Sequence, residues 1–368
     1  MTKITLGAEA MKLIKKVAAL KKGKYSVPVL EYLKFTVLDD NQVSVMFCDS
    51  ELTVEKIIYA ISVENLSSKT FLVHTDVLKK VKGIKSNSLY SFETDGQSVT
   101  FNDNGVSKTS NAVDEDIYPT FPEDEYEKMV ALNKDLLSKL QASTLSASTS
   151  ETRPILTQVC MRQDSVISTD SHRLFMTEYK GKLGEQDFVV SPLLIAAVAS
   201  VEKNDKNFFG VIHLGNYHVL IETMTGRYCF RRVEGNFPDT SRLIPTEFRT
   251  EFDIQDTTKF MSVLSACYEL TKDSVHTMVT FEINDRSLLM YSQTEAGEKV
   301  TEELDIIPDG KNSPDKLKIT FSSKFLLDAL KQLGTEKITF LMATAQRPFL
   351  VGGKDKDSRA LILPVRAF

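Results

Sequence analysis

Apolar and polar positions follow the same order three times along the 368-residue chain. In each copy, a segment with apolar residues at helical spacing comes before a polar corner between strand-like segments. A second helical segment comes after that corner. The repeat is about 120 residues long, which is the size of a whole domain. The pattern therefore predicts three similar domains, with helical segments at residues 7–20 and 74–84, 133–143 and 190–201, and 256–268 and 321–333.

A polar corner between two extended segments is the clearest part of the repeat. The stretch VSVMFCDSELTVEKII, around Asp49, reappears as DSVISTDSHRLFMTEY around Asp170, 121 residues later (170 minus 49). A fainter copy, RSLLMYSQTEAGEKVTEEL, surrounds Ser292. We expect Asp49, Asp170 and Ser292 to occupy equivalent corners.

Each repeat is predicted to have an α+β fold. Short segments rich in Val, Ile, Phe and Thr, separated by Asp, Asn, Gly and Ser, indicate strands, and two amphipathic helices per repeat can cover the sheet face. Helix starts are indicated by Thr75 as a cap, by Ser191 before Pro192, and by Ser322 or Ser323. Polar segments separate the repeats, which places the predicted domains at residues 1–127, 128–247 and 248–368.

Composition agrees with a globular chain, because hydrophobic residues make up 42% and charged residues 26%. No stretch approaches the roughly 18 apolar residues of a membrane span, and no signal peptide follows Met1, so we expect a cytoplasmic protein. We expect no metal or other cofactor, because the cysteines are far apart and are best interpreted as buried small hydrophobes. They are Cys48, Cys160, Cys229 and Cys267.

Positive charge is concentrated near the amino terminus, although the whole chain is mildly acidic, with 45 Lys plus Arg against 50 Asp plus Glu. Lysines lie opposite the apolar face of the first two helical segments, and more follow in the loop at residues 21–24. A solvated helix face is the plain alternative for a single helix. Acidic residues gather elsewhere, at 114–127, so the separation favours a surface that meets phosphates without reading bases.

Five segments together resemble the bacterial DNA polymerase III beta subunit, or sliding clamp, with some divergence. They are ETRPIL (151–156), STDSHRLFM (168–176), EGNFPDTSRLIP (234–245), FSSKFLLDAL (321–330) and LILPVRAF (361–368). The resemblance implies the DNA clamp fold: three similar domains, each with two helices packed on antiparallel sheets, and two chains joined head to tail as a ring around duplex DNA. It also implies partners, namely the clamp loader, the alpha-type subunit of the replicative polymerase, other proteins with clamp-binding motifs and a second copy as homodimer. Location would be cytoplasmic, with nucleoid association when the ring is loaded.

Residues facing DNA are expected from the helix pattern and from the resemblance. Lys24, in GKYSVPVL, and Ser150 and Arg153 match family loops that touch DNA. The remaining members come from the helix pattern: Lys12, Lys15, Lys16, Lys79, Lys80 and Lys82.

The resemblance also implies a cleft between the second and third domains that binds short linear peptides. Its leucines and Val365 would form an apolar pocket, prolines would fix the rim, and His172, Arg173 and Arg366 would present donors. The alternative for any single leucine is ordinary core packing. The matching positions are Leu156, Thr169, Ser171, His172, Arg173, Leu174, Pro238, Arg242, Leu243, Pro348, Leu361, Leu363, Pro364, Val365 and Arg366.

Catalysis is not expected, although Asp170, Ser171 and His172 are consecutive. Neighbours on an extended strand point to opposite faces, whereas the members of a triad must point at one another.

The competing hypothesis is a monomeric peptide-binding scaffold with a clamp fold that does not encircle DNA. Ser241, where a basic or aromatic residue is usual, and the tail at 367–368 depart from the commoner family pattern.

Overall fold

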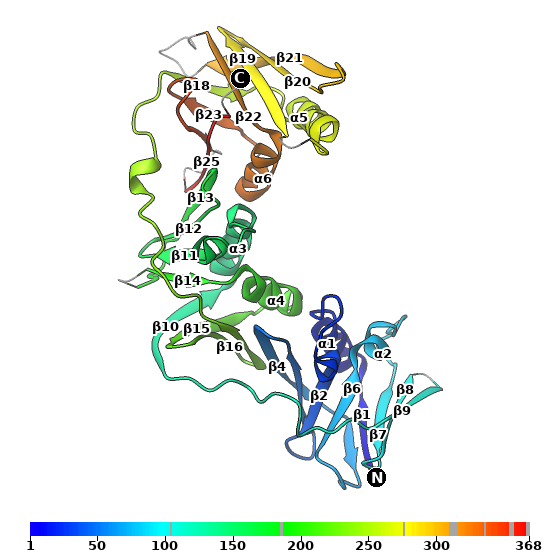
Figure 1. Ribbon diagram of the computed structural model, residues 1–368. Helices are drawn as coiled ribbons and strands as arrows, with labels where there is room; N and C mark the ends of the chain where they lie inside the picture. The colour runs from blue at the N-terminus through cyan, green and yellow to red at the C-terminus, as the bar shows by residue number, and fades with distance from the viewer. Residues whose placement is uncertain are drawn as a thin grey trace. The chain divides into compact units, whose positions relative to one another are not determined.

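The fold was analysed in a computed structural model, which describes residues 1–103, 105–184, 187–274, 277–308, 316–334, 336–352 and 357–365, without the side chain of Lys128. The architecture is α+β with antiparallel strand pairing, as the sequence predicts. Contacts within the chain define two units: residues 1–137 with 193–232, and residues 138–192 with 233–368. Figure 1 labels most of the elements of both.

All six predicted helices are present in the described residues, but one is much shorter than expected. The second helical segment forms α-helix only over Thr75–Lys79, instead of residues 74–84. Its cap is His74, whose Nδ1 accepts the N–H of Asp76 at 3.2 Å, so the prediction of Thr75 as cap was wrong. Gly83, with φ of 64°, allows the chain to turn away where the helix was expected to continue. The helices are α1 (Ala8–Ala18), α2 (Thr75–Lys79), α3 (Lys134–Ser143), α4 (Pro192–Glu202), α5 (Thr257–Thr271) and α6 (Ser323–Leu333).

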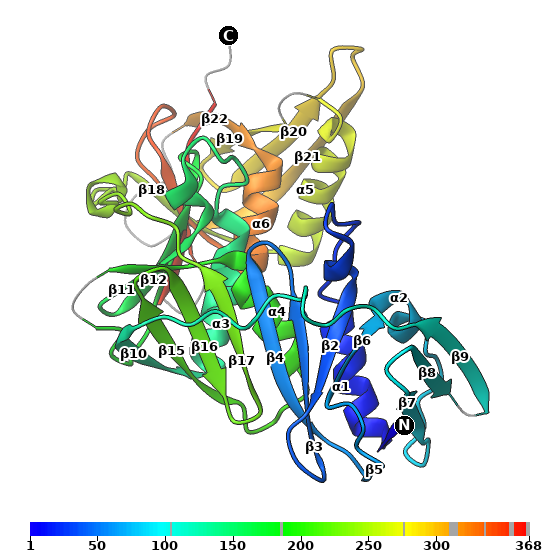
Figure 2. The same cartoon turned by 60° about the horizontal axis from the view of Figure 1, so that its bottom comes forward.

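Two sheets form the first unit, and α1 packs beside α2 and against β3 and β4. The smaller sheet has the order β5-β1-β7-β8-β9, and Figure 2 shows β9 at its edge. Its strands are β1 (Thr2–Leu6), β5 (Ser62–Glu64), β7 (Tyr90–Thr94), β8 (Ser98–Asp103) and β9 (Val106–Asn111). The larger sheet has the order β10-β15-β16-β17-β4-β3-β2-β6. Its strands are β2 (Tyr32–Val37), β3 (Gln42–Cys48), β4 (Leu52–Tyr59), β6 (Thr70–His74), β10 (Tyr126–Asn133), β15 (Phe209–Gly215), β16 (His218–Thr223) and β17 (Gly226–Arg231).

One twelve-stranded sheet runs through the second unit, in the order β14-β11-β12-β13-β25-β24-β23-β18-β21-β20-β19-β22. Helix α5 packs against β19, β20 and β21, and it lies beside α6. The strands are β11 (Val159–Arg162), β12 (Ser165–Thr169), β13 (Arg173–Glu178), β14 (Phe188–Val190), β18 (Thr250–Ile254), β19 (Met278–Asn284), β20 (Ser287–Gln293), β21 (Lys299–Pro308), β22 (Leu317–Ser322), β23 (Thr339–Met342), β24 (Phe349–Gly352) and β25 (Ser358–Ile362).

One pattern of strand pairing occurs twice, once in each unit. Val54 of β4 pairs with Tyr228 of β17, and Phe175 of β13 pairs with Ala360 of β25. The steps are 121 (175 minus 54) and 132 (360 minus 228), and every pair in the two ladders keeps them. We call the β4–β17 ladder the first seam and the β13–β25 ladder the second seam. The strands of residues 128–247 are thus shared between the two units, with β10 and β15 to β17 in one and β11 to β14 in the other.

Two of the three predicted corners are equivalent. Asp49 Oδ1 accepts the N–H groups of Glu51 and Leu52 at 2.9 and 2.7 Å. Asp170 Oδ1 accepts those of the two equivalent residues at 2.9 and 3.0 Å. The placement of Ser292 was wrong, because it lies inside β20 with its hydroxyl donating to Met278 O at 2.7 Å. The third corner begins two residues later, where Thr294 Oγ1 accepts the N–H of Glu298 at 3.1 Å.

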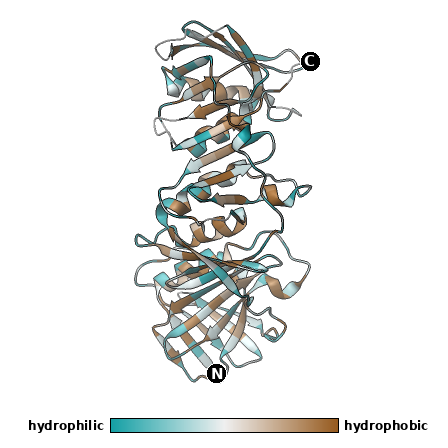
Figure 3. Cartoon of the chain, turned by 90° about the vertical axis from the view of Figure 1, so that its left-hand side faces the viewer, coloured by the Kyte–Doolittle hydropathy of each residue, from teal (hydrophilic) through white to brown (hydrophobic). Residues whose placement is uncertain are grey.

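Buried side chains alternate along strands such as β2 and β7, whereas β3 and β12 are buried almost throughout. Figure 3 shows brown and teal mixed along the ribbons. The core of the second unit is built on phenylalanines, with Phe260, Phe281 and Phe340 in edge and tilted contacts. All four cysteines are buried, as predicted. Among the described helices, none combines the length and apolar character needed to cross a membrane.

Candidate functional site

Four distant segments meet beside the second seam, where the sequence predicts an apolar pocket. Leu156, Leu174 and Leu361 retain only 5, 3 and 1% exposure, and they form one cluster with Phe237. Leu363 is partly buried against the same cluster. The structure therefore brings the predicted leucines together, but the three buried ones serve as core and can offer a peptide only the floor of a cleft.

Local sequence places these side chains. Pro154 occupies the first turn of the 3₁₀ helix Pro154–Thr157, which directs Leu156 inward. Leu174 and Leu361 face each other across the second seam. The chain beyond β25 stays attached to the corner, because the N–H of Leu363 donates to His172 O at 3.0 Å.

The other predicted cleft residues divide into a rim and a few buried groups. Leu243 is 53% exposed at the end of a short 3₁₀ helix, Ser241–Leu243. Thr169 is buried, and its hydroxyl donates to Arg173 O at 2.6 Å. Arg366 lies outside the described residues, as do Ala367 and Phe368. Exposed members of the rim are Ser171, His172, Pro238 and Arg242, and partly buried members are Pro348, Pro364 and Val365.

Asp170, Ser171 and His172 form the tight corner between β12 and β13, not part of a strand. The strand argument against a triad was therefore wrong in its premise. Both oxygens of Asp170 are engaged, Oδ1 by two backbone N–H groups and Oδ2 by Arg173. Ser171 has a φ of 79°, an unfavourable conformation for a residue with a side chain. Its neighbour His172 stacks on Phe325 at 6.5 Å between ring centroids.

Arg173, which the resemblance implies as a donor to a bound peptide, already has partners within the chain. Its Nε donates to Asp170 Oδ2 at 2.9 Å and its Nη1 to Asp328 Oδ2 at 2.7 Å. The guanidinium lies 4.5 Å from the centroid of the Phe325 ring, and the side chain is 10% exposed. These partners engage two of the five N–H donors of the guanidinium, both through carboxylates. Sequence reasoning missed Asp328 and Phe325, although both lie in FSSKFLLDAL, a segment it had singled out.

The predicted basic surface in the first unit contains two kinds of lysine. Lys16 Nζ donates to Val201 O at 2.7 Å, Lys15 Nζ donates to Val81 O, and Lys79 Nζ donates to Lys21 O at 3.1 Å. Burial, followed by the nearby charge of Lys21, lowers the pKa of Lys79. These lysines bind carbonyl groups at the ends of structural elements and are only partly available to an anion.

Exposed cations form the second kind. Lys24, Lys80 and Lys82 are exposed, whereas Lys12 pairs with Glu9 at 2.7 Å. In the second unit, Ser150 and Arg153 are also exposed on the turn that leads into the Pro154–Thr157 helix. Contact with DNA stays a prediction for all of them.

The loop that carries Lys24 is fixed by a partly buried acid, Glu31. Glu31 accepts the backbone N–H of Tyr25 at 2.8 Å and pairs with the buried ammonium of Lys21. The Tyr25 hydroxyl donates to Asp49 Oδ2 at 3.4 Å, and burial followed by that carboxylate raises its pKa. The hydrogen bond from Tyr25 to Asp49 thus connects this basic loop to the first corner.

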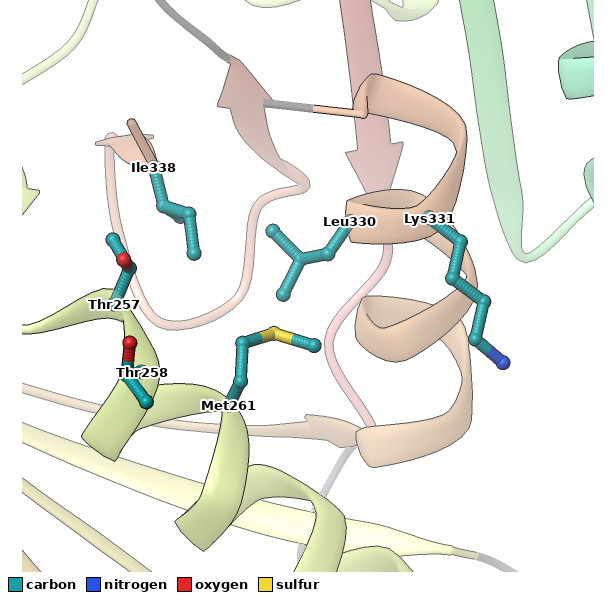
Figure 4. Close-up of a pocket in the computed structure, with 6 residues that line it drawn as sticks. All are labelled: Thr257, Thr258, Met261, Leu330, Lys331 and Ile338. Atoms are coloured by element: carbon teal, nitrogen blue, oxygen red, sulfur yellow. The ribbon is translucent and has the colours of Figure 1, made fainter. Parts of the chain in front are cut away.

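A hollow of about 370 Å³ lies at another place in the second unit, between α5 and α6. Figure 4 shows Met261 and Leu330 facing each other across it, while the ammonium of Lys331 points away. None of the predicted cleft residues that the structure describes lines it. Its remaining walls are Thr257, Thr258 and Ile338.

Comparisons with known proteins all point to similarity with bacterial beta sliding clamps. Residues 241–366 match the family model of the DNA polymerase III beta subunit, C-terminal domain. The chain is 26% identical over 365 residues to the beta sliding clamp of Bacillus subtilis (strain 168), covering 94% of both. Against the beta sliding clamp of Staphylococcus aureus (strain Mu50) it is 27% identical over 361 residues, covering 93% of both.

Solved structures of similar fold cover all of this chain and all of theirs. The DNA polymerase III beta chain of Streptococcus pneumoniae TIGR4 superposes with a TM-score of 0.86 at 24% identity. The DnaN sliding clamp of Pseudomonas aeruginosa bound to griselimycin gives 0.86 at 19%, and that of Bartonella birtlesii bound to griselimycin gives 0.88 at 17%. The predicted clamp fold is therefore confirmed.

Proposed function

We propose that this chain, a divergent member of the DNA polymerase III beta subunit family, works as a DNA sliding clamp. Two copies would close a ring around duplex DNA, and the leucine cluster beside the second seam would hold peptide segments of the polymerase and other factors. The chain would supply attachment and no catalytic step. We also propose the three domains at residues 1–127, 128–247 and 248–368, and a cytoplasmic location.

The strand edges carry the proposal of a ring. Within the chain, β17 pairs with β4 and β25 pairs with β13, always in the same register. In the described residues, β9 pairs only with β8, and residues 299–304 of β21 pair only with β20. Unpaired edges are a liability that proteins normally cover. A second copy can pair its β21 with this β9, and the same contact used twice closes a two-fold ring.

Charge on the two free edges supports that pairing. Every residue of β9 is exposed, and Lys108 lies in its middle. Glu303 and Asp305 are exposed on β21. Opposite charges favour the contact between β9 and β21 over a contact of either edge with itself.

Binding of DNA would depend on the exposed lysines. Lysine offers a point charge with little directional preference, which suits a ring that must slide. Open, non-specific binding has a dissociation constant of roughly 10⁻⁴ to 10⁻⁶ M at physiological salt, so retention would come from closure. Changing Lys80 and Lys82 to Gln should reduce the salt slope of DNA binding by about two. Lys16→Gln should reduce it less, because Lys16 already binds Val201 O.

The leucine cluster supports the peptide-binding part. It joins a buried apolar floor, Leu156, Leu174 and Leu361, to an exposed rim that includes His172 and Leu243. Ligand sites commonly combine apolar walls with a few polar groups of this kind. Two relatives are described as bound to griselimycin, and we propose that this chain binds it at the same cluster.

Sedimentation at several concentrations, with and without griselimycin, tests ring and cleft together. The clamp proposal predicts a dimer and a saturable complex that Leu363→Ala with His172→Ala removes without changing the sedimentation of the dimer. A chain that stays monomeric at micromolar concentration and still binds griselimycin would favour the monomeric scaffold instead. Loss of the dimer in the cleft variant would show that these residues are structural.

A further inference from the structure

The corner at residues 170–172 is attached to α6 through one side chain. Arg173 donates from Nε to Asp170 Oδ2 at 2.9 Å and from Nη1 to Asp328 Oδ2 at 2.7 Å. Asp328 is 5% exposed, and its only other side-chain partner among the described residues is Lys324, at 3.2 Å. Arg173 therefore connects a helix to a loop through two carboxylates.

Phe325, on the same helix, contacts two consecutive residues at the end of the corner, His172 and Arg173. The guanidinium of Arg173 lies 4.5 Å from the centroid of its ring, and the imidazole of His172 stacks on the ring at 6.5 Å. Asp170 holds the backbone of both residues by accepting their N–H groups. The position of His172 thus depends on α6 as well as on its own hairpin.

We propose that Asp328 is a positioning residue for the peptide-binding cleft, acting through Arg173 to hold the corner and the carboxy-terminal segment in place. The carboxy-terminal segment is included because Leu363 donates its N–H to His172 O at 3.0 Å. Arg173 fits this task because its planar guanidinium can bind two carboxylates at once and stack on a ring, which a lysine cannot do. This inference rests on the proposed function, and it assigns Arg173 to support of the cleft instead of direct contact with peptide.

Asp328→Asn removes the charge with little change of shape, and Lys324→Gln is its matched control on the same carboxylate. The first readout is the proton NMR signal of the His172 imidazole in the free protein, assigned by its disappearance in His172→Gln. The second is the affinity for griselimycin, measured by calorimetry. The proposal predicts a shifted His172 signal and about tenfold weaker binding in Asp328→Asn, with neither change in Lys324→Gln.

The double variant Arg173→Gln with Asp328→Asn separates this network from general destabilisation. If the two residues act as one unit, the double variant binds no more weakly than Arg173→Gln alone. Fully additive losses would overturn the proposal. Asp328→Glu, which keeps the charge, should recover part of the affinity, and failure to do so with an unshifted His172 signal also counts against it.

The two readouts distinguish this inference from the function on which it rests. A wild-type chain that does not bind griselimycin would contradict the proposed cleft, while the His172 signal would still decide whether Asp328 holds the corner. An unshifted signal in Asp328→Asn overturns the positioning role, and a shifted signal with unchanged affinity overturns its importance for binding. Should Asp328→Asn fail to fold, Phe325→Leu replaces it, with the same shift and loss expected because the ring supports both Arg173 and His172.

Discussion

The two seams share one strand register but differ in the groups that hold them. In the first seam, Lys56 is fully buried, and its Nζ contacts Glu202 Oε1 and Thr225 Oγ1, both at 2.6 Å. Tyr228 donates to the same oxygen of Glu202 at 2.5 Å. Burial lowers the pKa of Lys56, and the charge of Glu202 opposes that effect. A buried ion pair therefore joins β4, β17 and the end of α4.

The second seam has a neutral residue at the place of Lys56, although Arg173 and its two carboxylates lie at the start of the same ladder. The register puts Thr177 where the first seam has Lys56 (177 minus 56 is 121), and its Oγ1 accepts from Ser358 Oγ at 2.8 Å. Nearby, Gln332 accepts from Ser146 Oγ at 3.0 Å and donates to Ala142 O at 3.0 Å. The comparison teaches that backbone pairing defines the seam, while either charged or neutral side chains can satisfy its buried polar groups.

Breaking the charge pair of the first seam should have the largest effect. Lys56→Met leaves Glu202 buried without its cation, so the free energy of unfolding should fall by about 3–5 kcal/mol. Denaturant unfolding measures it. The double variant Lys56→Met with Glu202→Leu should recover most of the loss, since the uncompensated charge is gone. A double variant as unstable as the single one would mean that packing, not charge, decides the first seam.

Removing the buried amide of the second seam should have a smaller effect. Gln332→Leu leaves the Ser146 hydroxyl and the Ala142 carbonyl without this partner, so the free energy of unfolding should fall by about 1–3 kcal/mol. The same denaturant experiment provides the value. A loss as large as that of Lys56→Met would contradict the distinction between the buried charge pair and the neutral amide.

The proposed contact between β9 of one copy and β21 of another is open to test by charge reversal. Glu303→Lys with Asp305→Lys places positive charge opposite Lys108, so the dimer dissociation constant should rise about tenfold or more. Sedimentation over a dilution series measures this constant. Adding Lys108→Glu should restore part of the affinity, and no change in either variant would remove these edges from the interface.

The two equivalent corners allow the finest comparison. Ser171 has a φ of 79°, whereas Ser50, in the first corner, is not among the residues with positive φ. Ser171→Gly should raise the free energy of unfolding by about 0.5 kcal/mol, because it relieves backbone strain in excess of its entropic cost. Ser50→Gly should lower it by about 0.5–1 kcal/mol, because only the entropic cost applies. Thermal melting of both variants checks the opposite signs.

Periodicity was enough to predict the α+β fold and the positions of most helices. It failed for residues 80–84, where Gly83 turns the chain, and for Ser292, where the third corner shifted by two residues. The 121-residue step between Asp49 and Asp170, by contrast, reappears unchanged between β4 and β13, whereas β17 and β25 are 132 residues apart. The spacing of apolar residues thus predicted helices and strands well, except where a glycine turn or a shifted corner changed the backbone.

Side-chain partners were less predictable than their positions. The leucines of the cluster were named from family motifs, and the structure brings Leu156, Leu174 and Leu361 together. Nothing in the spacing indicated that Arg173 would bind Asp328, 155 residues further along, or that Lys16 would bind Val201 O. Those contacts depend on how distant elements pack, which helix periodicity does not encode.

Release from DNA by cutting tests the central claim most directly. The chain is loaded by a bacterial clamp loader onto nicked circular DNA, the loader is washed away at high salt, and the DNA is then cut once. If the ring is closed, the protein stays on the intact circle at high salt. It then slides off the DNA as soon as the circle is cut. Loss from the uncut circle at high salt, or persistence on the linear product, would contradict encirclement.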